Sequence, residues 1–295
     1  AVSTCRSRLF PAQSNRVSAQ FYLVERGSFW FMARFCPLFS GSSGNSYYIG
    51  SADHGVLIDA GKNAKQITEA LNRCEIPVSA IEAIFVTHEH SDHVSGLRVF
   101  ASRHKIPVYA STGTMLALEE QGILNGKFPA FALSEEGMEC AGMYIKPFPI
   151  PHDCAEGYGY RLMTSDGRGV SVATDLGYMT AEVREAVTGS DLLVLESNHD
   201  IGMLRTGPYP YALKQRILSG IGHLSNLSCA EELCRFVQTG TTRFWLAHLS
   251  QENNTPELAY QTSLCSLKMA GMKENLDFQL FVAPRVNETG KVMVF

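Results

Sequence analysis

Short apolar runs alternate with amphipathic stretches along the chain from Met32 onward. Two such runs, at residues 47–49 and 56–58, flank a Ser-Ala-Asp-His-Gly turn and predict a β-hairpin. Asn63 is a suitable N-cap for a helix that runs to about Asn72. The first half continues with a predicted strand at 84–87, a helix at 94–104, a strand at 108–110 and a helix at 113–121.

The second half begins with three strand-like runs, which predict consecutive antiparallel strands at 143–148, 159–163 and 170–174. Ser228 and Glu231 form a capping-box pattern that predicts a helix starting near Cys229. Thr255 and Pro256 suit the N-cap and first residue of a helix to about Ala270. The other predicted elements are strands at 192–196 and 244–249 and a helix at 211–218. Because no linker separates the halves, the pattern predicts one α/β domain with two sheets sandwiched by helices.

The first 31 residues differ in composition from the rest. They are rich in Ser and Arg, and Glu25 is their only acid. Their apolar stretch at 21–32 is too short and too interrupted for a membrane span or a signal sequence. An organellar transit peptide and an extension ahead of a start at Met32 both fit this composition. We therefore expect 1–31 to be an N-terminal extension, disordered or absent from the mature protein, and 32–295 to be the domain.

The formal net charge of −4 argues against a broadly basic surface of the kind that binds nucleic acid non-specifically. Any contact with nucleic acid must then be local, and Lys214, Arg216 and Arg205 are candidates for it. Scattered cations on an ordinary solvated face are the alternative. The eight cysteines form no CxxC pair, which indicates reduced thiols. We expect a cytoplasmic protein with no membrane partner.

The strongest chemical signal is the segment Thr87-His88-Glu89-His90-Ser91-Asp92-His93, which follows an apolar strand. Alternate residues of an extended segment point the same way, so His88 and His90 are predicted to bind one metal ion. Asp92 and His93, at the start of the next helix, are predicted to reach a second ion. Imidazole and carboxylate ligands suit zinc, and also manganese or iron. The alternative, four solvated loop residues, fits poorly with so dense a cluster of ligand types.

These residues form an HxHxDH motif, and here the chain resembles the metallo-β-lactamase superfamily. The resemblance implies a four-layer αββα sandwich, two divalent metal ions and three later ligands. His152, Asp175 and His248 stand at the matching positions, each after a strand-like run. Asp175 is expected to bridge the two ions, and Asp59 to accept a hydrogen bond from a ligand imidazole. A structural histidine at 152 and turn aspartates at 59 and 175 are the alternatives.

Further motifs narrow the resemblance to the YycJ/WalJ branch over residues 32–295. They are Ser-Gly-Ser-Ser-Gly-Asn-Ser from Ser40, Glu-Ser-Asn-His-Asp from Glu196, Gly-His-Leu-Ser-Asn from Gly222 and His-Leu-Ser-Gln-Glu-Asn-Asn from His248. This branch implies a metal-dependent DNA exonuclease, with DNA repair as a setting. Similarity to the superfamily's tRNA 3′-processing nucleases implies that Glu196 and His223 form a catalytic pair. The stretch between Asp175 and His248 is short for the helical insert of the RNA-processing branch, which argues against long structured RNA.

The expected chemistry follows from the metal pair. Two cations about 4 Å apart lower the pKa of a shared water towards about 7, and the bridging hydroxide attacks a phosphodiester. Asp92 belongs to this catalytic centre. His223 is expected to protonate the leaving oxygen while Glu196 orients it, and a simple loop histidine is the alternative. Ser42, Ser43 and Asn45 are predicted to contact a phosphate, unless they are only a Gly/Ser-rich connector.

His199 is also predicted to contact substrate, whereas His54 and His104 are expected at the surface.

Two other functions remain open. A thioesterase or lactonase of the glyoxalase II type would use the same metal site on a small ester, and a non-catalytic metal-binding regulator would use it for signalling. The sequence leaves the metal, DNA against RNA, the polarity of digestion and the oligomeric state undecided.

Overall fold

Two mixed β-sheets form the centre of the protein in a computed structural model that describes residues 33–295. The first sheet has the order β14-β1-β2-β3-β4-β5-β6. Its strands are β1 (Arg34–Phe39), β2 (Ser46–Gly50), β3 (Gly55–Ile58), β4 (Ile81–Phe85), β5 (Val108–Ala110), β6 (Ala130–Ala132) and β14 (Met293–Val294). The predicted hairpin is confirmed, since β2 and β3 pair antiparallel with Tyr47 opposite Ile58.

The second sheet has the order β13-β12-β11-β10-β9-β8-β7. Its strands are β7 (Met138–Cys140), β8 (Met143–Pro149), β9 (Tyr158–Thr164), β10 (Gly169–Ala173), β11 (Leu192–Glu196), β12 (Arg243–Ala247) and β13 (Gln279–Val282). The predicted antiparallel run β8-β9-β10 is confirmed. From β10 onward the strands are parallel, so the carboxyl ends of β10, β11 and β12 meet at one edge of the sheet.

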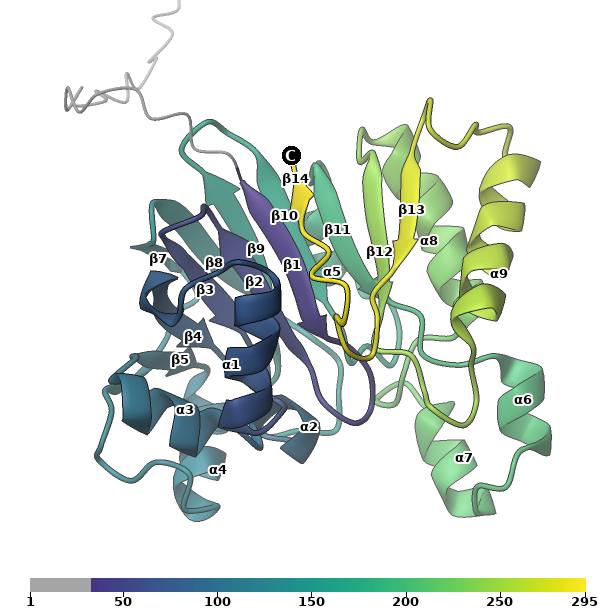
Figure 1. Ribbon diagram of the computed structural model, residues 1–295. Helices are drawn as coiled ribbons and strands as arrows, with labels where there is room; N and C mark the ends of the chain where they lie inside the picture. The colour runs from purple at the N-terminus through teal and green to yellow at the C-terminus, as the bar shows by residue number, and fades with distance from the viewer. Residues whose placement is uncertain (1–32) are drawn as a thin grey trace, which may run out of the picture. The chain divides into compact units, whose positions relative to one another are not determined.

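Helices cover the outer faces of both sheets, with α1 and α3 beside the first sheet and α8 and α9 on the side of β12 and β13 (Figure 1). The helices are α1 (Ala64–Arg73), α2 (Ser91–Val94), α3 (Leu97–His104), α4 (Thr112–Glu120), α5 (Ala181–Val187), α6 (Ile201–Thr206), α7 (Tyr211–Ile217), α8 (Asn226–Gln238) and α9 (Pro256–Met269). A 3-10 turn at Val78–Ala80 precedes β4. The predicted αββα sandwich is confirmed.

Three apolar clusters hold these layers together. Phe35, Tyr160 and Trp245 belong to the cluster between the two sheets. A second cluster packs α1 and α3 on the first sheet, and a third packs α5, α8 and α9 on the second. Because both faces of the central strands are covered, strands such as β11 are buried at every position rather than alternately.

Two sequence predictions about helices are wrong in detail. The helix expected at 94–104 is two helices, because α2 ends at Val94 and α3 begins at Leu97. The helix expected near Cys229 begins at Asn226 instead. Ser225, not Ser228, is its N-cap, since the Ser225 side chain accepts a hydrogen bond from the Ser228 N–H.

The predicted extension at 1–31 lies outside the described residues. Within residues 33–295, no helix combines the length and apolar character that crossing a membrane requires. The loops that follow β1, β3, β4, β8, β10, β11 and β12 carry most of the candidate chemical groups, so the sheet edges position the site, and His223 lies just before α8.

Candidate metal centre

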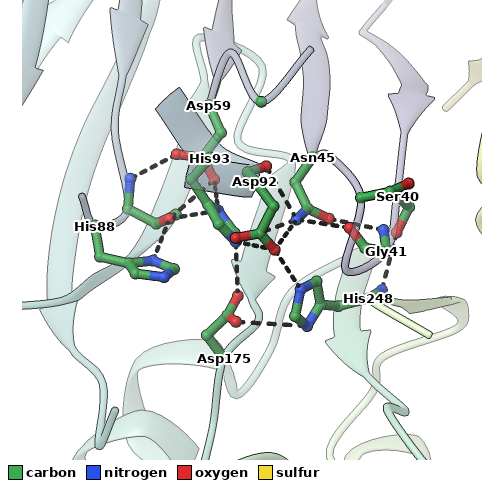
Figure 2. Close-up of polar contacts among 12 residues, drawn as sticks. Ser40, Gly41, Asn45, Asp59, His88, Asp92, His93, Asp175 and His248 are labelled. Atoms are coloured by element: carbon green, nitrogen blue, oxygen red, sulfur yellow. Dashed lines mark hydrogen bonds and ion pairs between the residues drawn. The ribbon is translucent and has the colours of Figure 1, made fainter. Parts of the chain in front are cut away.

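The predicted metal ligands come from four separate segments, around 88–93, 152, 175 and 248, and lie close together. Figure 2 shows five of them: His88, Asp92, His93, Asp175 and His248. Possible ligand atoms lie within 4.8 Å of one another in four overlapping groups. One of these is His88, His93 and Asp175, another is Asp175, Glu196, His223 and His248, and the remaining two share no residue. One of the two is His88, His90 and His152, and the other is Asp92, His93 and His248.

Asp175 lies between the two groups. Its Oδ2 is 3.4 Å from Nε2 of His93, and its Oδ1 is 3.7 Å from Nε2 of His152. The same Oδ1 is 3.5 Å from Nδ1 of His248. One carboxylate therefore reaches both sets of ligand atoms, which is the arrangement needed to bridge two cations.

Three site residues adopt a left-handed backbone conformation that non-glycine residues rarely use. Their φ angles are 63° at Asp59, 60° at Asp175 and 55° at His248. Each residue follows the end of a strand, so the left-handed turn redirects the chain where the sheet stops. Such a conformation costs about 1–3 kcal/mol and is typical of functional sites.

Hydrogen bonds fix the orientation of four imidazoles in the cluster, one of them through Nδ1 of His88, which lies 3.0 Å from Oγ1 of Thr87. In each, Nδ1 contacts an oxygen of the protein. The other pairs are His93 with Asp59 (2.7 Å), His152 with the Gly222 carbonyl (3.1 Å) and His248 with Glu196 (2.8 Å). With Nδ1 engaged as a donor, Nε2 keeps its lone pair, which is the form that binds a metal. The hydrogen bond expected from a ligand imidazole to Asp59 is therefore present.

Two buried polar atoms of the cluster lack hydrogen-bond partners within residues 33–295. They are Nε2 of His88 and Oδ2 of Asp175. Leaving a buried polar atom unpaired costs about 1–3 kcal/mol, and a cation at the cluster would satisfy both atoms. Imidazole nitrogens and carboxylate oxygens together are suitable donors for zinc, manganese or iron. The residues present thus fit divalent metal ions.

Glu196 and His223 are in direct contact, as the sequence suggested. Oε1 of Glu196 lies 2.9 Å from Nδ1 of His223, and Oε2 accepts hydrogen bonds from the N–H groups of Leu176 (2.8 Å) and Leu224 (3.0 Å). Burial alone would raise the pKa of Glu196, but His223 and His248 outweigh it and lower the pKa. The carboxylate is therefore a fixed anion behind His223, whose side chain is 15% exposed.

Two of the predicted substrate contacts are buried in the structure. Asn45 is fully buried, and its Nδ2 lies 3.1 Å from Nε2 of His93 and 3.4 Å from Oδ2 of Asp92. His199 is only 1% exposed, and burial lowers its pKa to about 4. Both side chains are enclosed by protein, so Asn45 instead supports the ligand loop. By contrast, Ser42 and Ser43 are exposed.

The predicted cationic contacts have different outcomes. The Lys214 ammonium donates to the carbonyl oxygens of Arg205 (2.8 Å) and Gly207 (2.7 Å), so it joins α6 to α7 rather than standing free. Arg216 pairs with Asp153, beside the predicted ligand at 152, at 2.8 Å from Nη2 to Oδ1. The Arg205 side chain is exposed on α6.

Of the two histidines expected at the surface, His54 is exposed and contacts Glu82 at 2.7 Å. His104 is half-buried, with its ring 5.0 Å from that of Phe100, so the surface prediction holds only in part.

Sequence reasoning missed several residues that support the cluster. Thr87 donates its N–H to Oδ1 of Asp59 (2.7 Å) and its hydroxyl to Oδ2 (2.9 Å). Ser40 accepts a hydrogen bond from the N–H of His248 (2.9 Å), and Asn198 donates to the carbonyl of the same residue (2.9 Å). All three belong to motifs used for the resemblance, which was the available signal.

Glu89, inside the HxHxDH segment, was also missed. Its Oε1 accepts a hydrogen bond from the N–H of Ala155 at 2.7 Å. Glu89 is buried, so this bond ties the ligand loop after β4 to the loop that carries His152. The two histidine segments of one ligand group are thereby held together.

Comparison with known proteins agrees with this geometry. A model of the Beta-lactamase superfamily domain matches residues 54–249. The chain belongs to the metallo-β-lactamase superfamily. It is 36% identical over 252 residues to Exodeoxyribonuclease WalJ of Streptococcus pneumoniae serotype 2 (strain D39 / NCTC 7466), covering 84% of this chain and 93% of that protein.

A second relative in this superfamily is Exodeoxyribonuclease YycJ of Bacillus anthracis, 37% identical over 229 residues, or 76% of this chain and 85% of that protein. Among solved structures, the metallo-beta-lactamase fold protein YhfI from Bacillus subtilis aligns with a TM-score of 0.66 at 14% identity. The alignment covers 90% of this chain and all (100%) of that chain, and it shows the shared fold. The chain is therefore a metal-dependent hydrolase of the YycJ/WalJ branch of its superfamily.

Proposed function

We propose that the chain is a phosphodiesterase that uses two metal ions to remove nucleotides from the ends of DNA. The names of both curated relatives, exodeoxyribonucleases, support DNA as the substrate. The observation that supports the two-metal site most strongly is the position of Asp175 between two groups of three ligand residues. We propose zinc or manganese as the ions, with iron also compatible with the donor set.

In this proposal His88, His90 and His152 would hold one ion, Asp92, His93 and His248 would hold the other, and Asp175 would be shared between them. When bound, such a pair ionises a water and neutralises charge on a phosphoryl oxygen. The surrounding residues orient the imidazoles that would bind the ions. Asp59 holds His93 through Nδ1, and Thr87 holds Asp59, so the imidazole keeps one tautomer and one direction.

His223 is the proposed proton donor to the leaving oxygen. Its Nδ1 faces Glu196 at 2.9 Å, so the buried anion stabilises the protonated imidazole and leaves Nε2 available. The distance from its Nδ1 to Oδ1 of Asp175 is 3.7 Å, which keeps the ring beside the proposed metal pair. The leaving oxygen departs as an alcohol because it takes the Nε2 proton.

The exposed Ser42 and Ser43 are the proposed contacts for a substrate phosphate. Lys62 donates to Oγ of Ser43 at 3.2 Å, so a positive charge accompanies the two hydroxyls. The same loop also supports the predicted ligands, because Asn45 lies beside Asp92 and His93. Phosphate contact and metal site would then share one rigid loop.

The experiment that tests this function is hydrolysis of three substrates by the purified chain loaded with zinc or manganese. They are DNA labelled at a defined 5′ or 3′ end, bis-p-nitrophenyl phosphate and a thioester. We expect stepwise loss of nucleotides from DNA ends and turnover of the phosphodiester. Thioester turnover without hydrolysis of either phosphodiester would overturn the proposal in favour of an esterase.

A further inference from the structure

Large apolar side chains are exposed on the loops beside the metal cluster. Tyr178 is 53% exposed, Ile221 51% and Leu218 38%. Tyr178 follows Asp175 by three residues, and Ile221 precedes His223 by two. Exposing apolar surface at these places costs solvation free energy, and clustered exposure of this kind commonly marks a binding surface.

The loops that carry these side chains are fixed against one another. The Gly177 N–H donates to the carbonyl of Pro151 at 2.9 Å, and the Asp153 N–H donates to the carbonyl of Ile221 at 3.2 Å. A Cβ added at Gly177 would lie only 2.1 Å from the Gly220 carbonyl oxygen, so the two backbones are in contact. The rim of the site is therefore rigid.

The ring of Tyr178 lies along this contact. A Cβ added at Gly220 would be 3.7 Å from its Cδ1 and 3.8 Å from its Cε1, which is ordinary van der Waals contact. Gly220 has no side chain of its own, so the ring packs on backbone while more than half of the residue stays open to solvent. The ring thus has a supported position and an accessible surface.

A cation completes the rim. Nη2 of Arg216 lies 2.8 Å from Oδ1 of Asp153, and the Arg216 side chain is 45% exposed. Aromatic surface next to a cation is how proteins bind unpaired nucleic acid, because bases stack on the ring and phosphates meet the charge. A chain with net charge −4 cannot rely on a broad basic surface to attract phosphates. Stacking of bases would therefore supply a larger share of the affinity for nucleic acid.

We propose that Tyr178, with Ile221 beside it, binds an unpaired nucleobase next to the phosphate that is cleaved, while Arg216 meets the neighbouring phosphate. This proposal rests on the proposed DNA hydrolysis and names the form of DNA that the site takes. An unpaired base has a free face for the ring, whereas a base inside a duplex is covered by its neighbours. The rim therefore accommodates a DNA end whose last base is unpaired.

The test uses the metal-loaded chain, Tyr178→Ala and Tyr178→Phe. The substrates are single-stranded oligonucleotides that carry either natural bases or abasic sugars at the last two positions. Loss of stacking raises KM on natural ends by about 5-fold to 100-fold in Tyr178→Ala and changes kcat less. Tyr178→Phe keeps the stacking face and stays close to the wild type. On abasic ends the KM of the wild type should rise to that of Tyr178→Ala. The substitution itself should raise KM no further on these ends.

Tyr144→Ala is the matched control, because Tyr144 is 42% exposed on β8, outside the loops of this rim. It should leave both kinetic constants unchanged, and metal content should be equal in all variants. If the wild type degrades DNA and Tyr178→Ala has the same KM, or if its defect is as large on abasic ends, stacking is refuted while DNA hydrolysis stands. If the wild type hydrolyses no DNA, the proposed function fails and this inference fails with it.

Discussion

Oδ2 of Asp59 accepts a 2.7 Å hydrogen bond from Nδ1 of His93, and both side chains are fully buried. The opposite ring nitrogen, Nε2, lies 3.4 Å from Oδ2 of Asp175 (Figure 2). Asp59 is itself held by the N–H and hydroxyl of Thr87. A chain of fixed contacts therefore runs from the end of β3 into the cluster and sets the direction of one imidazole.

Replacing Asp59 by Asn should weaken metal binding while the predicted ligands stay in place. Asn tolerates the left-handed backbone at this position, so the main change is loss of the acceptor charge behind His93. We expect a loss of about 10-fold to 100-fold in metal affinity, measured by competition with a chelator. Asp53→Asn, at an exposed position, is the control. Equal affinities in wild type and Asp59→Asn would show that this hydrogen bond does not matter.

His223→Ala should separate catalysis from metal binding. Removing a general acid lowers kcat by about 100-fold to 10,000-fold. His223 is not one of the predicted ligands, but it shares a candidate ligand group with Asp175, Glu196 and His248, so metal content must be followed as well. Metal content and kcat on labelled DNA are measured together, with the exposed His54→Ala as control. An unchanged kcat refutes the proton-donor role, and loss of one metal ion would assign His223 as a ligand instead.

Glu196→Gln should also lower kcat more than it lowers metal binding, but by less than His223→Ala does. The neutral amide keeps the size of the side chain but no longer stabilises a positive His223. Because Glu196 also contacts Nδ1 of His248, some loss of metal affinity accompanies the loss of kcat. The informative measurement is kcat on labelled DNA beside metal content, in which kcat should fall by more than the loss of metal explains. A kcat equal to that of the wild type would contradict the pairing.

Most of the fold could be predicted because burial on both sides leaves uninterrupted apolar runs, as in β11. Errors arose where two local signals compete. Ser225 and Ser228 both precede a helical pattern, and only the tertiary structure selects Ser225 as the N-cap. Strands β1, β6, β7, β13 and β14 escaped prediction, although β5, with only three residues, was recognised.

The cluster itself was predictable because its ligand types are rare and closely spaced in the HxHxDH segment. The supporting residues were not, because Thr87 and Asn198 are ordinary polar residues whose hydrogen bonds depend on distant segments. The same reason explains why the burial of Asn45 and His199 was not predicted. Both stand in polar motifs that look exposed, and only the packing of the two sheets buries them.

Gly61→Ala should damage the site without removing a ligand. A Cβ at this position would lie 1.8 Å from the Asp92 carbonyl oxygen and 2.5 Å from the Asn45 nitrogen, so one of these backbones must move. We expect a destabilisation of about 1–3 kcal/mol in denaturant unfolding, with reduced metal content. Gly169→Ala is the control, because its nearest contact is the flexible Met163 sulfur at 3.3 Å. Equal stability and metal content in both variants would contradict the tight packing at Gly61.

Chelation should lower the thermal stability of the protein. A ligand at 100 times its Kd stabilises the native state by about 2.7 kcal/mol, and metal removal abolishes this contribution. The imidazoles must be deprotonated to bind, so protons compete with the metal and the affinity falls as the pH drops. Thermal unfolding with and without EDTA, at pH 7.5 and 5.5, should show a larger effect of the chelator at the higher pH. No effect at either pH would contradict metal binding at the cluster.

The central claim is that Asp175 lies between two bound cations, and anomalous X-ray scattering from crystals grown with manganese tests it most directly. We expect two peaks, one beside His88, His90 and His152 and one beside Asp92, His93 and His248, with the Asp175 carboxylate in contact with both. A map with no peak in this cluster, or with a single peak that Asp175 does not contact, would contradict the account.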